Sequence, residues 1–306
     1  MGQYVARRLL GSLLVILGVS VVTFCLSFLS GDPAELMLPP GATPEQMAQF
    51  RAAWGFDQPL YQQYGRFLAR AIQGDFGVSL RHGEAALPLI AERLPATFQL
   101  TVTAMLLAII VAVPLSILSA THRGGLVDFA AMAVALVGQA VPNFWLATMF
   151  ILLFAVSLGW LPTSGRGTWQ HIVLPATAIA INLLALLTRL GRSALLEVLA
   201  EDYVRTARAK GVNEWLVLTR HALRNALIPL VTVVGLQFGY ILGGAVVVET
   251  VFTYPGVGLF TIQAIQNRDY PVVQASVFIL ATAVVLINLA VDLLYGSLDP
   301  RIRLHA

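Results

Sequence analysis

Uninterrupted apolar runs constrain this chain more than any other feature of its sequence. The first run extends from Leu9 to Leu29 and is long enough to form a helix of about 30 Å, the thickness of the hydrocarbon core of a bilayer. The composition agrees, because 58% of the 306 residues are hydrophobic and 11% are charged, whereas soluble domains carry roughly 25% charged residues. The chain is therefore predicted to be an all-α integral membrane protein.

Further apolar runs give about six transmembrane helices in a single membrane domain, residues 1–306. The other five spans are predicted at Phe98–Ala120, Phe129–Leu158, Ile172–Leu187, Leu230–Val248 and Val272–Leu294. An even number of spans places both termini on the same side of the membrane.

The distribution of basic residues predicts that this side is the cytoplasm. The long outer segment, residues 30–96, also carries arginines, but long loops count for little in the positive-inside rule. The net charge of +3 is not gathered on one face, so nucleic-acid binding is not expected. The basic residues on the inner side are Arg7, Arg8, Arg123, Arg189, Arg192, Arg205, Arg208, Lys210, Arg220, Arg224, Arg301 and Arg303.

Prolines predict irregular helices in the middle of the bundle. Val141-Pro142 lies within the third span and Pro175 within the fourth, and proline both removes a backbone donor and clashes with the preceding turn. A kink frees a carbonyl group that neighbouring helices or water must satisfy. Such breaks are compatible with a pathway through the bundle or with a purely structural kink.

The fifth span carries Gly235, Gly239 and Gly243 at four-residue spacing. This spacing places three hydrogen side chains along one helix face, where another helix can approach closely. The close contact is predicted within the subunit, and a contact with a partner subunit is the alternative.

Amide side chains lie within several of the apolar spans. Polar groups in a membrane are costly unless they face a cavity or each other, so these amides are candidates for lining a translocation path. Hydrogen bonds between helices, worth about 0.6–2 kcal/mol, are the competing explanation. Arg189 and Asp292 lie near inner span ends and are assigned structural roles. The candidate amides are Gln139, Asn143, Asn182 and Gln237.

The outer segment, residues 30–96, is predicted to be folded. Pro44–Trp54 has a helical pattern with Thr43 as its N-cap. Aromatic residues are frequent here, and we expect them to anchor the segment at the membrane surface, with an external partner as the alternative. These residues are Trp54, Phe56, Tyr61, Tyr64, Phe67 and Phe76.

The inner loop, residues 188–228, is polar and has the pattern of a helix, a break and a second helix. Gly211 can adopt the left-handed conformation that ends a helix, and Asn213 can cap the next one. Because so short a helix is marginal alone, its apolar and small residues are expected to dock on a cytoplasmic partner, and an amphipathic loop on the membrane surface is the alternative. Glu201 and Asp202 favour the start of the first helix, and Arg208 and Lys210 its end.

Two runs in this loop carry a family resemblance: Glu201-Asp202-Tyr203-Val204-Arg205-Thr206-Ala207-Arg208-Ala209-Lys210-Gly211 and His221-Ala222-Leu223-Arg224-Asn225-Ala226-Leu227-Ile228-Pro229. Shorter runs extend it over nearly the whole chain: Gly31-Asp32-Pro33, Asp57-Gln58-Pro59-Leu60-Tyr61, Gly74-Asp75-Phe76-Gly77, Arg268-Asp269-Tyr270-Pro271 and Asp299-Pro300-Arg301-Ile302-Arg303. With these runs the chain resembles binding-protein-dependent ABC importer permeases of the dipeptide, oligopeptide and nickel subgroup.

The resemblance implies a coupling helix at about Tyr203–Gly211 that sits in a groove of an ATPase subunit and transmits its opening and closing. In the general permease pattern this loop opens with Glu-Ala-Ala and reaches glycine four residues after the second alanine. Here Arg205 and Thr206 stand at the first two positions of that pattern, so the leading glutamate is missing. Glu201 or Asp202 could supply its negative charge from a position further upstream. The residues expected to couple to the ATPase are Glu201, Asp202, Tyr203, Arg205, Thr206, Ala207, Arg208, Lys210 and Gly211.

The same resemblance implies a bacterial inner-membrane complex containing a second homologous permease, two cytoplasmic ATPase subunits that hold ATP and Mg, and an extracytoplasmic solute-binding protein. Lys210 is the only lysine, and no glycine-rich phosphate loop precedes it, so the chain itself is not expected to be an ATPase. No catalytic residue, bound cofactor or metal is predicted for it. Cys25, the only cysteine, is expected to have a packing role.

The implied function is conduction of di- or oligopeptides by alternating access, powered by the separate ATPase subunits. Nickel or other metal chelates and glutathione remain open as substrates. A self-sufficient secondary transporter is the alternative from a different class, because it would also have six apolar spans and buried amides.

Overall fold

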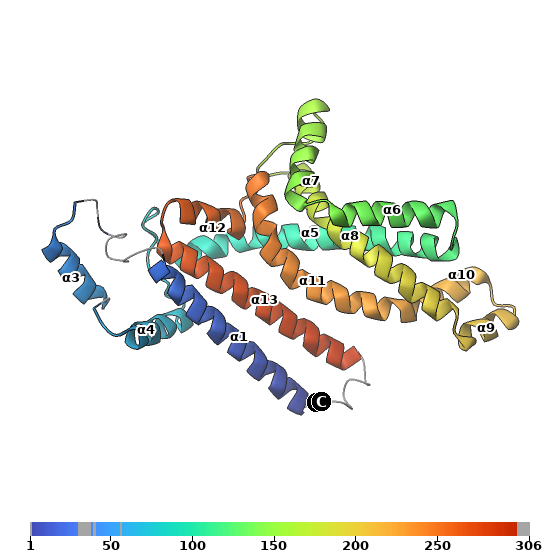
Figure 1. The fold of residues 1–306 in the computed structure, drawn as a ribbon, viewed down its shortest axis with the longest axis horizontal. Coiled ribbons are helices and arrows are strands. Elements are labelled where there is room, and N and C mark those ends of the chain that lie inside the picture. The colour runs from blue at the N-terminus through green and yellow to red at the C-terminus, as the bar shows by residue number, and fades with distance from the viewer. Residues whose placement is uncertain (1, 30–37, 39–40, 56, 299–306) are drawn as a thin grey trace. The chain divides into compact units, whose positions relative to one another are not determined.

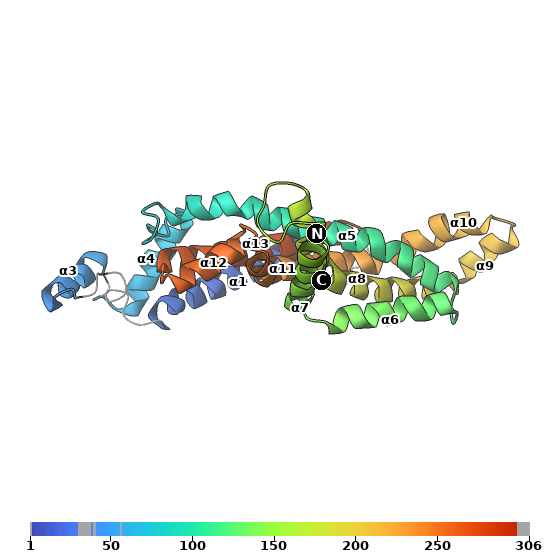
Figure 2. The same ribbon diagram turned by 90° about the horizontal axis from the view of Figure 1, so that it is seen from above.

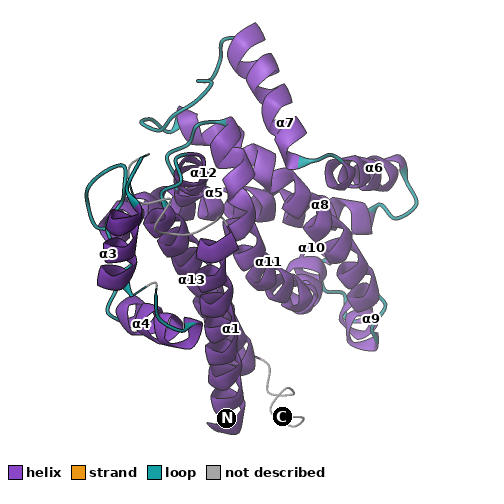
Figure 3. Cartoon of the chain, turned by 60° about the vertical axis from the view of Figure 1, so that its left-hand side comes forward, coloured by secondary structure: helices purple, strands orange, loops and turns teal. Residues whose placement is uncertain are grey.

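The computed structural model describes residues 2–29, 38, 41–55 and 57–298, and every regular element in these ranges is a helix (Figure 3). The prediction of an all-α chain is confirmed. Five helices are long and apolar enough to cross a bilayer, and one broken helix pair is a sixth candidate span. The predicted runs at Gly31-Asp32-Pro33 and Asp299–Arg303, as well as Phe56, lie outside the described residues.

The chain forms two compact units. The described residues up to Thr97 and from Pro255 onward form the first unit, and Phe98–Tyr254 forms the second. In the first unit, α1 (Gly2–Leu29) and α13 (Tyr270–Leu298) run side by side (Figure 1). Arg8 Nη1 lies 2.9 Å from Asp292 Oδ2 across this pair, which agrees with a structural role for Asp292.

The outer segment contains α3 (Pro44–Trp54) and α4 (Leu60–Ile72). The predicted cap of α3 is confirmed. Thr43 Oγ1 accepts a hydrogen bond from Gln46 N at 3.3 Å, and Gln46 Oε1 accepts one from Thr43 N at 2.9 Å. This reciprocal arrangement satisfies two backbone donors that the first turn of a helix leaves unpaired.

Some aromatic residues of this segment pack within the unit, and anchoring of the segment at the membrane surface stays a prediction. The ring of Tyr64 meets that of Phe24 on α1 edge to face at 5.6 Å, and its hydroxyl lies 2.7 Å from Ser20 Oγ. Phe76 packs against Phe278 of α13 with ring centroids 5.6 Å apart. Tyr61, by contrast, is exposed.

The core of the first unit lies where the beginning of α5 (Ala86–Thr121) meets α12 (Val257–Gln266) and α13. Phe260 and Ile90 are buried in this core. Its buried residues are Ala86, Leu89, Ile90, Val257, Phe260, Ala264, Val272 and Ala275.

The second unit is built around α8 (Gln170–Leu199), which contacts α6 (Leu126–Ala140) and α11 (Leu223–Val251). Figure 2 shows α6 alongside α8. Gly191 lets α8 approach α5 closely, because an added Cβ would collide with Ser116. Ser116 Oγ also lies 3.2 Å from the carbonyl oxygen of Thr188 and donates to it.

The third predicted span, Phe129–Leu158, is wrong as a single helix. α6 ends at Ala140, and the chain then bends by 102°. A new helix, α7 (Asn143–Phe150), follows the bend and continues directly into a π-helix, η1 (Ile151–Ser157). Val141 has an extended backbone because the following Pro142 disfavours the helical conformation, and Pro142 itself offers no N–H. Figure 3 shows α7 leaving the end of α6 in a different direction.

Candidate functional site

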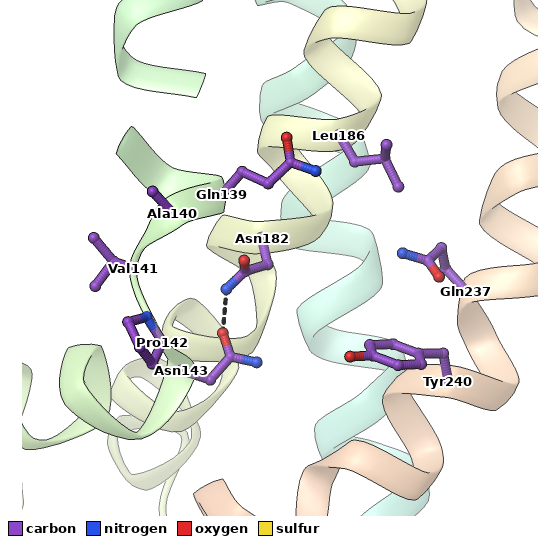
Figure 4. Close-up of a pocket in the computed structure, with 9 residues that line it drawn as sticks. All are labelled: Gln139, Ala140, Val141, Pro142, Asn143, Asn182, Leu186, Gln237 and Tyr240. Carbon is purple, nitrogen blue, oxygen red and sulfur yellow. Dashed lines mark hydrogen bonds between the residues drawn. The ribbon is translucent and has the colours of Figure 1, made fainter. Parts of the chain in front are cut away.

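The break between α6 and α7 brings polar side chains together in the second unit. Gln139 lies at the end of α6, and Asn143 is the first residue of α7. Asn182 of α8 and Gln237 of α11 complete the set, so all four predicted amides lie around one pocket of roughly 410 Å³ (Figure 4). The residues that line it are Gln139, Ala140, Val141, Pro142, Asn143, Asn182, Leu186, Gln237 and Tyr240.

Hydrogen bonds orient three of the four amides around this pocket. Asn182 Nδ2 donates to Asn143 Oδ1, and Arg189 of α8 donates from Nη1 to Gln139 Oε1. Figure 4 shows the carboxamides of Gln139, Asn143 and Gln237 pointing toward the same space from opposite sides. The lining residues carry no formal charge, so the pocket offers neutral hydrogen-bond donors and acceptors.

The predicted glycine face of α11 is only partly packed. Gly235 and Gly239 are buried, whereas Gly243 is exposed and an added Cβ there would meet no atom within 4 Å. No close helix contact therefore occurs at Gly243 among the described residues. A contact with a partner subunit stays a prediction for this position.

The predicted inner helix is present as α9 (Asp202–Ala209). Glu201 precedes its first residue with an extended backbone, and Gly211 has φ +76°, the left-handed conformation expected after its end. Asn213 accepts a hydrogen bond from Trp215 N at 2.9 Å, which confirms the predicted cap of the next helix, α10 (Glu214–Leu216). The signals for the start and the end of this helix were thus predicted correctly, although the helix ends at Ala209 and not at Gly211.

The orientation of α9 corrects one part of the prediction. Val204 and Ala207 are buried against Val217 of η2 (Val217–Ala222), so the apolar residues of α9 dock on their own subunit. Ala207 is only 8% exposed and does not belong to an outward-facing surface. The other residues expected to couple to an ATPase are exposed: Glu201, Asp202, Tyr203, Arg205, Thr206, Arg208, Lys210 and Gly211.

Polar contacts hold the exposed face of α9 in place. Arg208 Nη2 lies 2.6 Å from Glu214 Oε1 of α10, and this hydrogen bond raises the pKa of Arg208 above its usual value. Tyr203 Oη accepts a hydrogen bond from Asn225 Nδ2 of α11 at 2.7 Å. The α9 helix is therefore held on the subunit by its buried residues Val204 and Ala207 and by these polar contacts, while its charged and polar side chains remain exposed.

Sequence reasoning missed a buried ion pair in this unit. Asp128, at the start of α6, is buried and paired with Arg192 of α8. The two residues are 64 positions apart, and no local pattern links them. Among the described residues, no group of three or more His, Cys, Asp and Glu side chains could hold a metal ion.

Comparison with known sequences identifies relatives over nearly the whole length of the chain. Residues 112–304 match the model of a family described as "Binding-protein-dependent transport system inner membrane component", and residues 1–101 match the corresponding N-terminal model. The chain is 43% identical over 302 residues to the "Glutathione transport system permease protein GsiC" of Escherichia coli K12, covering 98% of this chain and 99% of that protein. The protein of the same name in Shigella dysenteriae serotype 1 gives the same values.

Solved structures support the fold. A chain of the MetNI methionine ABC transporter in an inward-facing conformation aligns with a TM-score of 0.60 at 18% identity, covering 69% of this chain and 96% of that one. A chain from an amino acid ABC transporter crystallised with histidines aligns with a TM-score of 0.52 at 17% identity, covering 70% and 94%. At these identities, the likeness concerns the fold alone.

Proposed function

Because this chain belongs to the family of binding-protein-dependent transport system inner membrane components, it is the permease subunit of an ABC importer, and we propose that it conducts small peptides or peptide-like solutes such as glutathione. The chain is a multi-pass protein of the bacterial inner membrane, and ATP is hydrolysed in partner subunits. The observation that carries the substrate proposal is the extended similarity to glutathione permeases.

The pocket between α6, α7, α8 and α11 supports a peptide-like solute. Peptide groups are neutral and need both a donor and an acceptor, and the amides of Asn143, Asn182 and Gln237 supply both kinds of group. A charged side chain in the lining would bind a solute of opposite charge too tightly to release it, and the neutral lining of this pocket avoids that. The four amides accordingly line part of the pathway in this proposal. The hydrogen bonds of Asn182 with Asn143 and of Arg189 with Gln139 hold part of that lining in place.

The exposed face of α9 is proposed to dock on an ATPase subunit. Val204 packs against Val217 of η2 and so anchors α9 on its own subunit. A movement of the exposed side chains of α9 would therefore be transmitted to η2 and on to α11. α11 contributes Gln237 to the pocket. A second homologous permease and two ATPase subunits would complete the complex, with ATP and Mg held by the ATPases, and a solute-binding protein would deliver the solute from outside. ATP would then shift the complex between two conformations, because the ATPase subunits bind ATP more tightly in one of them.

Uptake into proteoliposomes tests this proposal. The reconstituted complex and its cognate binding protein should take up tritiated glutathione or dialanine only when ATP is enclosed with the ATPase subunits. A nickel chelate is the competing cargo, and transport of labelled nickel without transport of either peptide would overturn the peptide proposal. Uptake by this chain alone, driven by an ion gradient, would instead favour a self-sufficient secondary transporter.

A further inference from the structure

Arg189 is a charged residue within a helix long and apolar enough to span the membrane, and it contacts the pocket wall. α8 extends from Gln170 to Leu199, and Arg189 donates to Gln139 Oε1. None of the ion pairs among the described residues involves Arg189. Arg189 follows the predicted apolar run Ile172–Leu187 and is exposed, so its position in α8 needs no special role, but snorkelling does not account for its hydrogen bond to an amide of the pocket wall.

The contact fixes which way the Gln139 carboxamide points. A guanidinium group has donors and no acceptor, so it can bind the oxygen of a glutamine side chain but not its NH₂ group. With Oε1 held by Arg189, the Nε2 donor of Gln139 is left for the pocket. Asn143 is arranged in the same way, because its Oδ1 accepts from Asn182 and its Nδ2 remains available.

We propose that Arg189 is a positioning residue that holds the Nε2 group of Gln139 toward the pocket, where it donates to a carbonyl or carboxylate oxygen of the transported solute. The inference rests on the proposed function, since it identifies the recognition chemistry of the same pocket. Two oriented amide donors in a neutral lining favour solutes that carry acceptor oxygens, as peptides do.

Direct binding to the purified permease and ATPase complex in nanodiscs tests the proposal. The probe is whichever of tritiated glutathione and dialanine the wild-type complex transports. Gln139→Leu removes the donor and should raise Kd about threefold to tenfold, the size expected for one hydrogen bond. Arg189→Met should raise Kd by a similar factor, whereas Arg189→Lys, which keeps a donor for Oε1, should restore most of the affinity.

A double mutant and two control variants separate positioning from structural damage. If Arg189 acts through Gln139, the combined Gln139→Leu and Arg189→Met variant should bind no more weakly than Gln139→Leu alone. Gln170→Leu and Arg123→Met remove an exposed amide and an exposed arginine of the same unit away from the pocket. Both should bind as the wild type does, and thermal unfolding of every variant checks that each is folded.

The source of the acceptor oxygen is resolved with a probe whose carboxylates are converted to carboxamides. If Gln139→Leu weakens binding of the carboxamide less than that of the parent probe, the acceptor is the carboxylate, and if it weakens both equally, the acceptor is a peptide carbonyl. An unchanged Kd in Gln139→Leu, or additive effects in the double variant, would overturn the inference. So would a wild-type complex that transports the probe but shows no saturable binding, whereas a complex that transports neither peptide would overturn the proposed function itself.

Discussion

Arg192 holds Asp128 through two hydrogen bonds, from Nε to Oδ1 at 2.6 Å and from Nη2 to Oδ2 at 2.7 Å. The same carboxylate accepts from Ser119 Oγ and from Gly124 N, so four donors converge on one buried group. The pair ties the turn between α5 and α6 to α8, the helix that leads directly into α9. It therefore stabilises the base from which the exposed face of α9 projects.

Removing one partner of this pair should destabilise the second unit. Asp128→Ala leaves Arg192 and two further donors without their acceptor in a largely buried place, which we expect to cost about 2–4 kcal/mol. Thermal or denaturant unfolding of the purified complex measures the loss. Asp75→Ala is a suitable control, because the pair of Asp75 with Arg70 is about half exposed and should contribute less than about 1 kcal/mol. Equal effects of the two substitutions would contradict a structural role for the buried pair.

Gly211→Leu should reduce the amount of solute taken up per ATP hydrolysed. The left-handed backbone at Gly211 costs a residue with a β-carbon about 1–2 kcal/mol, so the chain after α9 would change direction although space for a side chain exists. The measurement is the ratio of uptake to ATP hydrolysis in proteoliposomes. Gly159→Leu imposes the same strain in an equally open loop outside the α9 segment and should leave this ratio unchanged. Normal coupling in Gly211→Leu would count against the proposed role of this turn.

Val204→Ala should loosen α9 from its own subunit. Val204 is fully buried against Val217, and trimming it removes about 1–2 kcal/mol of packing. Amide hydrogen exchange of residues 202–209 should accelerate accordingly. Arg205→Ala, at the neighbouring exposed position, should change the free energy of local opening measured by exchange by less than about 0.5 kcal/mol. If α9 were held only by an external partner, exchange in the isolated subunit would be fast in the wild type and insensitive to Val204→Ala.

Asp269→Ala should release the turn at residues 77–85 from the start of α13. Asp269 is buried and accepts hydrogen bonds from Ser79 Oγ at 2.5 Å and from Leu80 N at 3.2 Å. The substitution removes both bonds and leaves their donors without an acceptor, which we expect to cost about 2–3 kcal/mol of stability. Trypsin should then cleave after Arg81 faster than in the wild type. Asn267→Ala removes two exposed hydrogen bonds, one from the Arg81 side chain and one to the carbonyl oxygen of Gln263, but keeps Asp269, so it serves as the control. Equal cleavage rates in the two variants would show that Asp269 does not hold the turn.

The sequence predicted where lipid-crossing helices lie better than how long they are. The predicted span Ile172–Leu187 falls inside α8, but α8 continues to Leu199 through residues assigned to the inner loop. An apolar run marks only the part of a helix that faces lipid or core, whereas packing against α6 and α11 stabilises the polar continuation. In the same way, α11 continues past the predicted span Leu230–Val248 to Val251, so Glu249 is buried within this helix.

Local signals were reliable where the cause is local. The caps at Thr43 and Asn213 and the left-handed Gly211 follow from side-chain and backbone chemistry within a few residues, and all three were predicted. Val141-Pro142 signalled a break, but the bend of 102° depends on how α7 packs on α8 and α11. The Asp128–Arg192 pair joins residues 64 positions apart, which no periodicity reveals. The inward orientation of Ala207 depends on how the chain after α9 folds back to place Val217 against it, and Ala207 shares its helix face with the buried Val204.

The central claim is that a peptide-like solute passes along the amide-lined pocket, and protection of a single cysteine tests it most directly. Ala140→Cys in a Cys25→Ser background places a thiol on the pocket wall, and Ala200→Cys places one on an exposed helix end away from it. With binding protein and ATP present, the transported peptide should slow modification of position 140 by a soluble thiol reagent several-fold and leave position 200 unaffected. Equal modification rates at position 140 with and without peptide, in a complex that transports that peptide, would contradict the account.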